Sequence, residues 1–98
     1  MTDQSEKSIF RRLNGYVKER DGEIFHTDVL YPGFPDKTIL LPGARIFFPE
    51  LKRPGGRMRP GQPYWQKRLR ELGFKVGKFD DYQLLIEWIE HGHQEKTD

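Results

Sequence analysis

Residues 36–52 read DKTILLPGARIFFPELK and contain the clearest structural signal in the chain. Two apolar runs, Lys37 to Leu41 and Arg45 to Leu51, are separated by Pro42-Gly43-Ala44. Short runs rich in Ile, Leu and Phe on either side of a Pro-Gly turn predict a β-hairpin. The elements before and after it are assigned outward from this hairpin.

The hairpin's open end holds an unusual pair of acids. A three-residue loop pairs Leu41 with Arg45, and counting outward along both strands then places Asp36 opposite Glu50. Cβ atoms of directly paired residues lie roughly 5 Å apart, so two carboxylates there repel each other unless a cation lies between them. Lys52 follows Glu50 by two residues and therefore lies on the same face of the strand.

Two acids and a lysine on one face have a specific chemical use. Oxygen ligands without sulfur or imidazole suit Mg²⁺ or Mn²⁺, which polarises a phosphoryl oxygen and lowers the pKa of bound water. A neighbouring ammonium orients or deprotonates that water, or offsets charge that grows on the phosphate. The alternative is a metal-free ion-pair cluster in which Lys52 only neutralises Asp36 and Glu50. Because these charges interrupt apolar strands, where burial is costly, we favour the metal site.

Before the hairpin, the pattern predicts one helix and one strand. Ser5 caps a helix with apolar residues at helical spacing, which ends at Asp21-Gly22. Residues 23–29 alternate loosely between apolar and polar side chains and predict a strand. Residues 31–35 are rich in Pro and Gly and predict a turn.

After the hairpin, a glycine-rich basic loop at residues 53–57 leads into a second helix that Gly73 closes at its C′ position. Residues 74–79 predict a short strand, and Asp80 with Gln83 resembles a capping box that opens a third helix. The order is then α-β-β-β-α-β-α. We therefore predict an α/β fold with a mixed central sheet flanked by helices.

The chain has 98 residues, which is enough for a single domain with one core. We expect this domain to span residues 1–98, with a core at about 5–91 and a disordered tail at 92–98. The absence of cysteine excludes disulfides and thiolate zinc sites. With no apolar run long enough to span a membrane and no signal peptide before Ser5, a cytoplasmic protein is expected.

Positive charge is concentrated in one part of the chain. Residues 52–78 hold nine of the 17 basic residues and one of the 15 acidic residues. A segregated basic block favours a polyanionic partner, although a solvated basic surface is the alternative. The flexible Gly55-Gly56 loop and its flanking guanidinium groups can follow a phosphate backbone. The candidate DNA-binding residues are Arg53, Arg57, Arg59 and Lys67.

Three elements in this order carry a family resemblance: GFPD at 33–36, ELKRPGGR at 50–57, and Gln62-x-x-Trp65-x-x-x-Leu69 followed by Leu72-Gly73. Together they resemble the virus-type replication-repair nuclease (VRR-NUC) domain of the PD-(D/E)XK nuclease superfamily. The resemblance covers about residues 5–91. It implies a restriction-endonuclease-like fold and divalent-metal-dependent DNA cleavage. For short stand-alone members it also implies phage or prophage origin, a bacterial host cytoplasm, and homodimers that act on branched DNA such as four-way junctions.

The resemblance also implies residue roles. The implied metal ligands are Glu6, Asp36, Glu50 and the carbonyl of Leu51. The implied catalytic residues are Asp36, Glu50, Lys52 and Gln62. Glu6 also fits a simpler role as an acid favoured near a helix N-terminus. Pro60 and Pro63 flank Gln62, and a helix that began one turn later would move this side chain.

Other features are weaker candidates. His91-Gly92-His93 has the residue types for metal binding, but a polar tail predicts disorder. His26 is interpreted as a packing or surface residue. Tyr64 stands beside Trp65 and the pair has the ring faces to stack on nucleotides, although the spacing of Trp65 favours a core position. Pro49 cannot donate to a sheet ladder and predicts a bulge or an unpaired edge.

Two rival functions remain open at this level. One is a non-catalytic DNA-binding protein with the same basic surface, and the other is a nuclease that acts on RNA or on linear DNA ends. Facing acids repel phosphate when no metal is present, so a protein that only binds DNA gains nothing from Asp36 opposite Glu50. This pairing favours a metal-dependent phosphodiester hydrolase.

Overall fold

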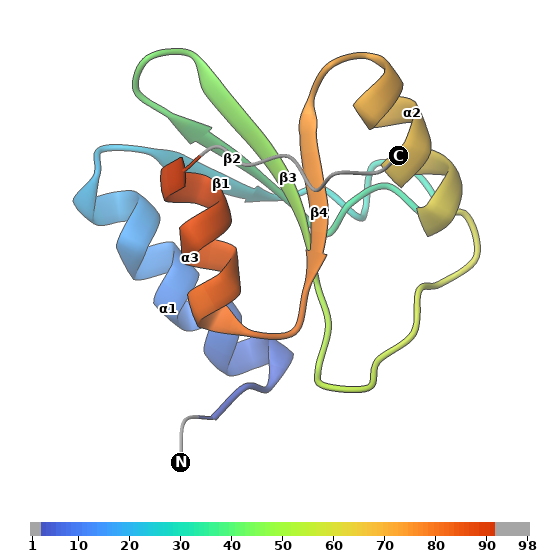
Figure 1. Ribbon diagram of the computed structural model, residues 1–98, viewed down its shortest axis with the longest axis horizontal. Coiled ribbons are helices and arrows are strands. Elements are labelled where there is room, and N and C mark those ends of the chain that lie inside the picture. The colour runs from blue at the N-terminus through green and yellow to red at the C-terminus, as the bar shows by residue number, and fades with distance from the viewer. Residues whose placement is uncertain (1–2, 92–98) are drawn as a thin grey trace.

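The computed structural model describes residues 3–91. Its helices and strands follow the predicted order α-β-β-β-α-β-α (Figure 1). In chain order they are α1 (Glu6–Glu19), β1 (Glu23–His26), β2 (Lys37–Leu41), β3 (Arg45–Leu51), α2 (Gln62–Glu71), β4 (Lys75–Phe79) and α3 (Tyr82–His91). The predicted tail at 92–98, including Gly92 and His93, lies outside the described residues.

The four strands form one mixed sheet in the order β1-β2-β3-β4. β2 and β3 are antiparallel, and Leu41 pairs with Arg45, as the three-residue loop predicts. Gly43 and Ala44 both take positive φ angles in that loop, of 85° and 60°. β3 and β4 are parallel, because α2 carries the chain back to the starting edge. The predicted mixed α/β sheet and the hairpin register are confirmed.

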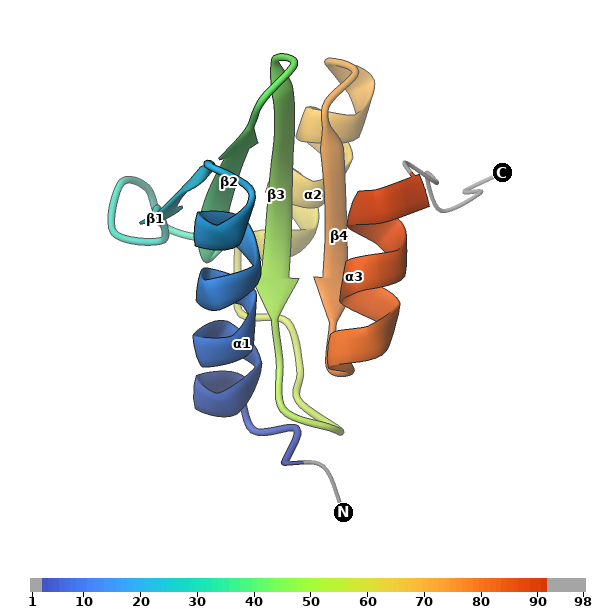
Figure 2. The ribbon, with the colours of Figure 1, turned by 90° about the vertical axis from the view of Figure 1, so that its left-hand side faces the viewer.

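The helices cover both faces of the sheet. α1 and α3 lie side by side on one face, and α2 lies on the other face beside β4 (Figures 1 and 2). Apolar side chains from α1, α3 and the facing side of the sheet form the core. Its members include Ile9, Leu13, Val17, Ile39, Leu41, Phe47, Leu51, Leu85, Trp88 and Ile89. This core fixes β3, whose far end carries the acidic residue of interest.

The helix ends follow local capping rules. Ser5 caps α1, and its side chain accepts a hydrogen bond from the Ser8 N–H at 3.1 Å. Gly73, at a φ of 93°, closes α2 as predicted: its own N–H donates to the Arg70 carbonyl, and the next N–H in the chain donates to the Leu69 carbonyl. The predicted capping box at α3 was displaced by one residue. Asp81, rather than Asp80, accepts from the Leu84 N–H at 3.1 Å.

Two strand predictions were too long. β1 ends at His26 rather than at residue 29, because the chain turns at Thr27, whose carbonyl accepts the Leu30 N–H. β4 begins at Lys75 rather than at residue 74, because the backbone of Phe74 is used to close α2. No helix in the described part of the chain has the length and apolar character to cross a membrane.

Pro49 causes no bulge against β4. β3 keeps a continuous parallel register through Pro49, which pairs with Gly77. On the other side, the ladder between β2 and β3 reaches only as far as the pair Ile39 and Phe47. The predicted unpaired edge therefore lies on the β2 side. Toward the open end of the hairpin, hydrogen bonds from backbone to side chains replace the backbone hydrogen bonds between β2 and β3.

Candidate active site

The open end of the β2–β3 hairpin brings Asp36 and Glu50 together, as the register predicts. The Asp36 N–H donates to Glu50 Oε1 at 3.1 Å, and the Leu51 N–H donates to Asp36 Oδ2 at 3.1 Å. Each acid thus accepts from the backbone of the opposite segment, where the ladder is missing. Asp36 is 6% exposed and Glu50 is fully buried. Both carboxyl groups are therefore held in fixed positions at a buried strand end.

A contact between two glycines holds the segment before Asp36 against the start of α2. Gly33 and Gly61 have φ angles of 83° and 88°, which L side chains rarely adopt. A Cβ on Gly33 would lie 2.4 Å from the carbonyl carbon of Gly61, so only glycine permits this approach. The loop at residues 52–61 therefore returns beside Asp36, although the two segments lie far apart in the chain.

Gln62 is the first residue of α2, so Pro60 and Pro63 do not displace it. Its side chain is fully buried, and its Nε2 donates to Glu50 Oε1 at 2.8 Å. Its Oε1 accepts a hydrogen bond from the Arg59 N–H. Because the oxygen is used in this way, the amide nitrogen must face Glu50. The structure therefore joins Gln62 to the acidic pair.

Glu50 is in an environment that disfavours its charged form. Burial, followed by the neighbouring Asp36 carboxylate, raises the pKa of Glu50 to about 8, and the Lys52 ammonium opposes this shift. Within residues 3–91, its Oε2 is buried and accepts no hydrogen bond. A buried carboxylate oxygen without a partner is costly, and either a proton or a cation removes that cost.

Lys52 lies just beyond β3 and is 6% exposed. Its N–H donates to the Phe79 carbonyl at 2.8 Å, which extends the pairing of β3 with β4 by one more residue. The charge of its ammonium group opposes the rise in the pKa of Glu50, which is consistent with the shared face that strand alternation predicts.

The donor set at this end of the sheet fits a hard divalent cation. It offers the unpartnered Glu50 oxygen and the Asp36 carboxylate, with the backbone of Leu51 fixed between them. Residues 3–91 hold no group of three or more His, Asp or Glu side chains arranged to bind a metal. Glu6 is exposed in the first turn of α1 and is thus not brought into a cluster with the two acids. Its role as a ligand stays a prediction.

The predicted DNA-binding residues occupy different positions. Arg53, Arg57 and Lys67 are exposed, the first two on the long loop between β3 and α2 (Figure 1). Arg59 is also exposed, but its guanidinium forms an ion pair with Asp36 Oδ1 at 2.9 Å. Arg59 is therefore part of the acidic site as well as of the basic loop.

The sequence analysis missed two buried polar residues, one bonded to the backbone of Asp36 and one on α2 a helical turn after Gln62. Thr27 is buried, its hydroxyl donates to the Pro35 carbonyl at 2.9 Å and its N–H donates to the Asp36 carbonyl at 2.9 Å. Gln66 is 6% exposed, and its Nε2 is buried without a hydrogen-bond partner among the described residues. The recurrence of glutamine at positions 62 and 66, one helical turn apart, was a signal for the second residue.

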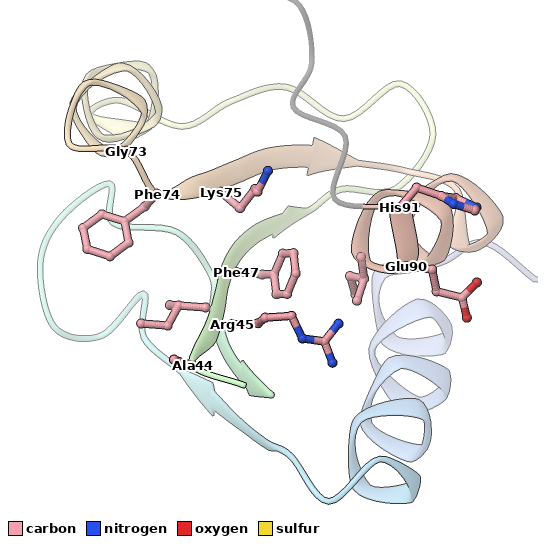
Figure 3. Close-up of a pocket in the computed structure, with 10 residues that line it drawn as sticks. Ala44, Arg45, Phe47, Gly73, Phe74, Lys75, Glu90 and His91 are labelled. Carbon is pink, nitrogen blue, oxygen red and sulfur yellow. The ribbon is translucent and has the colours of Figure 1, made fainter. Parts of the chain in front are cut away.

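The two histidines among residues 3–91, His26 and His91, make other contacts. His26 packs against the Phe10 ring, with centroids 4.8 Å apart, as a packing residue does. His91 ends α3 and lines a separate cavity of about 500 Å³ at the opposite end of the sheet, where Arg45 begins β3 (Figure 3). The rest of the His91-Gly92-His93 motif lies outside the described residues.

Of the comparisons with known proteins, the comparison with solved structures gives a match. Neither the family models nor the curated proteins contain a match to the chain. Among solved structures, one titled "VRR_NUC domain" superposes with a TM-score of 0.77, covering 94% of this chain and 100% of that chain. The chain has the VRR_NUC fold. The sequence identity is 21%, so the VRR_NUC likeness concerns the fold, and it confirms the fold that the sequence resemblance implies.

Proposed function

We propose that this protein is a metal-dependent nuclease that hydrolyses DNA phosphodiester bonds. The observation that carries the proposal is the buried Asp36–Glu50 pair beside Lys52, with one Glu50 oxygen lacking a partner among residues 3–91. A binding protein with no reaction to catalyse has no use for two repelling acids at a buried strand end. The VRR_NUC fold supports the same function by analogy, which is a weaker argument than the site.

Asp36, Glu50 and the Leu51 carbonyl are the residues that would hold Mg²⁺ or Mn²⁺. When bound, such an ion supplies positive charge that polarises a phosphoryl oxygen and lowers the pKa of water. Glu6 remains a candidate ligand, because the N-terminus of α1 lies at the same end of the molecule as the 52–61 loop (Figures 1 and 2).

Gln62 and Lys52 complete the proposed catalytic set. Gln62 fixes the Glu50 carboxyl group by donating to Oε1, which leaves Oε2 as the free ligand atom. The Lys52 ammonium stands next to Glu50 and stabilises negative charge that develops on the phosphate, or accepts a proton from the attacking water. Lys52 is held by its backbone bond to Phe79, so its position is set by the sheet.

The substrate that we propose is branched DNA, such as a four-way junction, cut by a homodimer in a bacterial cytoplasm and encoded by a phage or prophage. The support for these finer points is the motif resemblance, together with the basic residues of the 53–59 loop next to the acids. A nuclease that acts on RNA or on linear DNA ends uses the same site chemistry and is the enzymatic alternative.

A cleavage panel tests the proposal. The protein is incubated with duplex, flap, single-stranded and four-way-junction DNA and with RNA, each with Mg²⁺, with Mn²⁺, with Ca²⁺ and with chelator. We expect turnover with Mg²⁺ or Mn²⁺, and binding with little cutting in Ca²⁺, whose longer and looser coordination positions water poorly. Undiminished activity in excess chelator would contradict a metal mechanism.

Matched variants separate catalysis from binding in the same panel. Asp36→Asn and Glu50→Gln keep the size of each side chain and should reduce cleavage to background while leaving DNA binding in place. A protein that binds every DNA but cuts none, with or without metal, would instead support the non-catalytic alternative. Full activity in either variant would contradict the assignment of the site.

A further inference from the structure

An exposed aromatic groove adjoins the acidic site. Tyr31, Pro32, Gly61, Tyr64 and Trp65 line a cavity of about 580 Å³. Tyr31 and Tyr64 are 62% and 61% exposed, whereas an aromatic residue in the core, such as Trp88, is 7% exposed. The proposed catalytic mechanism gives these two exposed rings no role.

The rings in this groove leave flat surfaces open. Tyr31 meets Trp65 edge to face at 5.7 Å between centroids, and Tyr64 meets Trp65 edge to face at 5.3 Å. Phe34, which also packs against Phe48, meets Trp65 in the same edge-to-face manner at 5.1 Å. Because none of these pairs is stacked in parallel, the groove retains faces on which a further planar ring can stack.

The two chain segments that form the groove lead directly into residues of the acidic site. Gly61 directly precedes Gln62, whose amide donates to Glu50 at 2.8 Å. On the other wall, Tyr31 and Pro32 belong to the segment that leads into Asp36. The Gly33–Gly61 contact locks these two walls together. The cavity in Figure 3 lacks this connection, because it lies at the opposite end of β3.

The surroundings of the groove are basic. Lys67 and Arg68 follow Tyr64 by three and four residues, so all three side chains lie along one face of α2. Arg59 precedes Gly61 in the loop, where it pairs with Asp36. Arg68 pairs with Glu71 at 3.5 Å, and Lys67 is exposed. Exposed planar rings flanked by cations match a nucleotide, whose base stacks while its phosphates meet positive charge.

We infer that the Tyr31–Tyr64–Trp65 groove binds an unpaired nucleobase of the DNA substrate next to the phosphodiester that is cut. A base within an intact duplex is stacked on its neighbours and has no free face for this groove. The groove therefore selects DNA with an unpaired nucleotide at the cleavage site, as at a flap or at a junction whose base pairs open at the branch point. This inference rests on the proposed nuclease function and specifies its substrate class.

The test measures binding in chelator, so that cleavage does not contribute. Three fluorescent DNAs share one length: a full duplex, a duplex with a three-nucleotide flap, and the same flap with abasic sites. Tyr64→Ala should weaken binding of the flap about ten-fold and leave the duplex and the abasic flap unchanged. Tyr64→Phe keeps the ring and should bind the flap like the wild type. Leu84→Ala removes a 56% exposed apolar side chain from α3, on the other face of the sheet, and is the matched control.

A 2-aminopurine base in the flap gives a direct signal of stacking. Its fluorescence should fall when the wild type binds and should remain higher with Tyr64→Ala or Tyr31→Ala. An equal loss of affinity for all three DNAs would overturn the inference, as would unchanged binding of the flap. Sedimentation of each variant adds a further outcome: loss of a dimer, with all three DNAs affected alike, would assign the groove to contacts between copies and overturn the inference.

A parallel cleavage assay with Mg²⁺ separates the two proposals. If the wild type cuts the flap and Tyr64→Ala binds and cuts it equally well, the stacking inference fails while the nuclease proposal stands. If the wild type neither binds nor cuts any of the DNAs, both proposals fail. Cutting of the flap by the wild type, with a selective loss in Tyr64→Ala, supports both.

Discussion

The Arg59 guanidinium lies 2.9 Å from Asp36 Oδ1, so a cation already neutralises one side of a proposed metal ligand. The Asp36 side chain is 9% exposed and that of Arg59 is 55% exposed, which places the pair at the boundary between the buried site and solvent. A divalent ion that binds Asp36 must share or displace this guanidinium. Once released, Arg59 is available to a DNA phosphate.

Arg59→Ala should therefore tighten Mn²⁺ binding in the absence of DNA. An exposed ion pair is worth up to about 1 kcal/mol, which corresponds to an increase in affinity of up to about five-fold. Isothermal titration calorimetry measures the change. Lys67→Ala removes a positive charge from α2 and is the control, which should bind Mn²⁺ like the wild type. Equal tightening in both variants, or weaker binding in Arg59→Ala, would argue against competition at Asp36.

The Glu50 carboxyl group predicts how stability depends on pH. Burial raises the pKa of Glu50 from 4.5 to about 8, so between these values the folded protein holds a proton that the unfolded chain releases. The free energy of unfolding of the metal-free protein should then fall as pH rises from about 4.5 to about 8, by at most about 1.4 kcal/mol per pH unit. Below about pH 4.5 the Glu50 carboxyl group is protonated in both the folded and the unfolded protein, so its contribution to the free energy of unfolding is fully retained.

Urea denaturation in chelator at pH 5.5 and pH 8 measures this dependence. Glu50→Gln cannot titrate, so its stability should change less between the two pH values than that of the wild type. Mg²⁺ at pH 8 should restore stability to the wild type but not to Glu50→Gln, because a ligand that binds only the folded state stabilises it. Parallel pH dependence in both proteins would show that Glu50 does not titrate in this range.

The part of the site that lies on the hairpin could be predicted from the sequence. A strand has a two-residue period and the loop fixes the register, so the opposition of Asp36 and Glu50 followed from counting. Lys52 followed from the same alternation. Gln62 was found through a motif, and its position depended on where α2 begins, which two flanking prolines left open.

The rest depended on contacts between segments distant in the chain. The Gly33–Gly61 contact, the ion pair of Arg59 with Asp36 and the bonds made by Thr27 join loops that have no periodic pattern. Local rules place residues on elements, but they do not tell which loops meet. The cap of α3 is a smaller example. Two adjacent aspartates fit the same capping rule, and only the folded backbone shows that Asp81 is the one that caps the helix.

The basic loop predicts the salt dependence of DNA binding. Arg53 and Arg57 are exposed on the loop between β3 and α2, and each is expected to contact one phosphate. Replacing either with Ala should weaken binding alike for all sequences and reduce the slope of log affinity against log salt by about one unit. Arg45→Ala, at the start of β3 and the opposite end of the sheet, is the control. An unchanged slope in the loop variants would place the DNA elsewhere.

A homodimer is the working unit that we expect. With one proposed site, a single copy would cut one strand at a time, whereas two copies on a two-fold axis would present two sites of opposite polarity. That symmetry matches a four-way junction. Sedimentation at micromolar protein should give about twice the chain mass of 11.7 kDa, alone or with junction DNA. A species near the chain mass under both conditions would refute the dimer.

The glycine contact predicts a selective loss of the site. Gly33 and Gly43 have similar φ angles of 83° and 85°, so alanine adds comparable backbone strain at both. A Cβ at Gly43 has nothing within 4 Å, whereas at Gly33 it would lie 2.4 Å from Gly61. The methyl group added by Gly33→Ala must therefore displace Gly61, and this displacement weakens the hydrogen bond from Gln62 to Glu50. We expect Gly33→Ala to lower the free energy of unfolding by about 2 kcal/mol more than Gly43→Ala, as overpacking does, and to weaken Mn²⁺ binding. Urea denaturation and calorimetry measure the two effects, and equal values for the two variants would mean that the contact does not hold the site together.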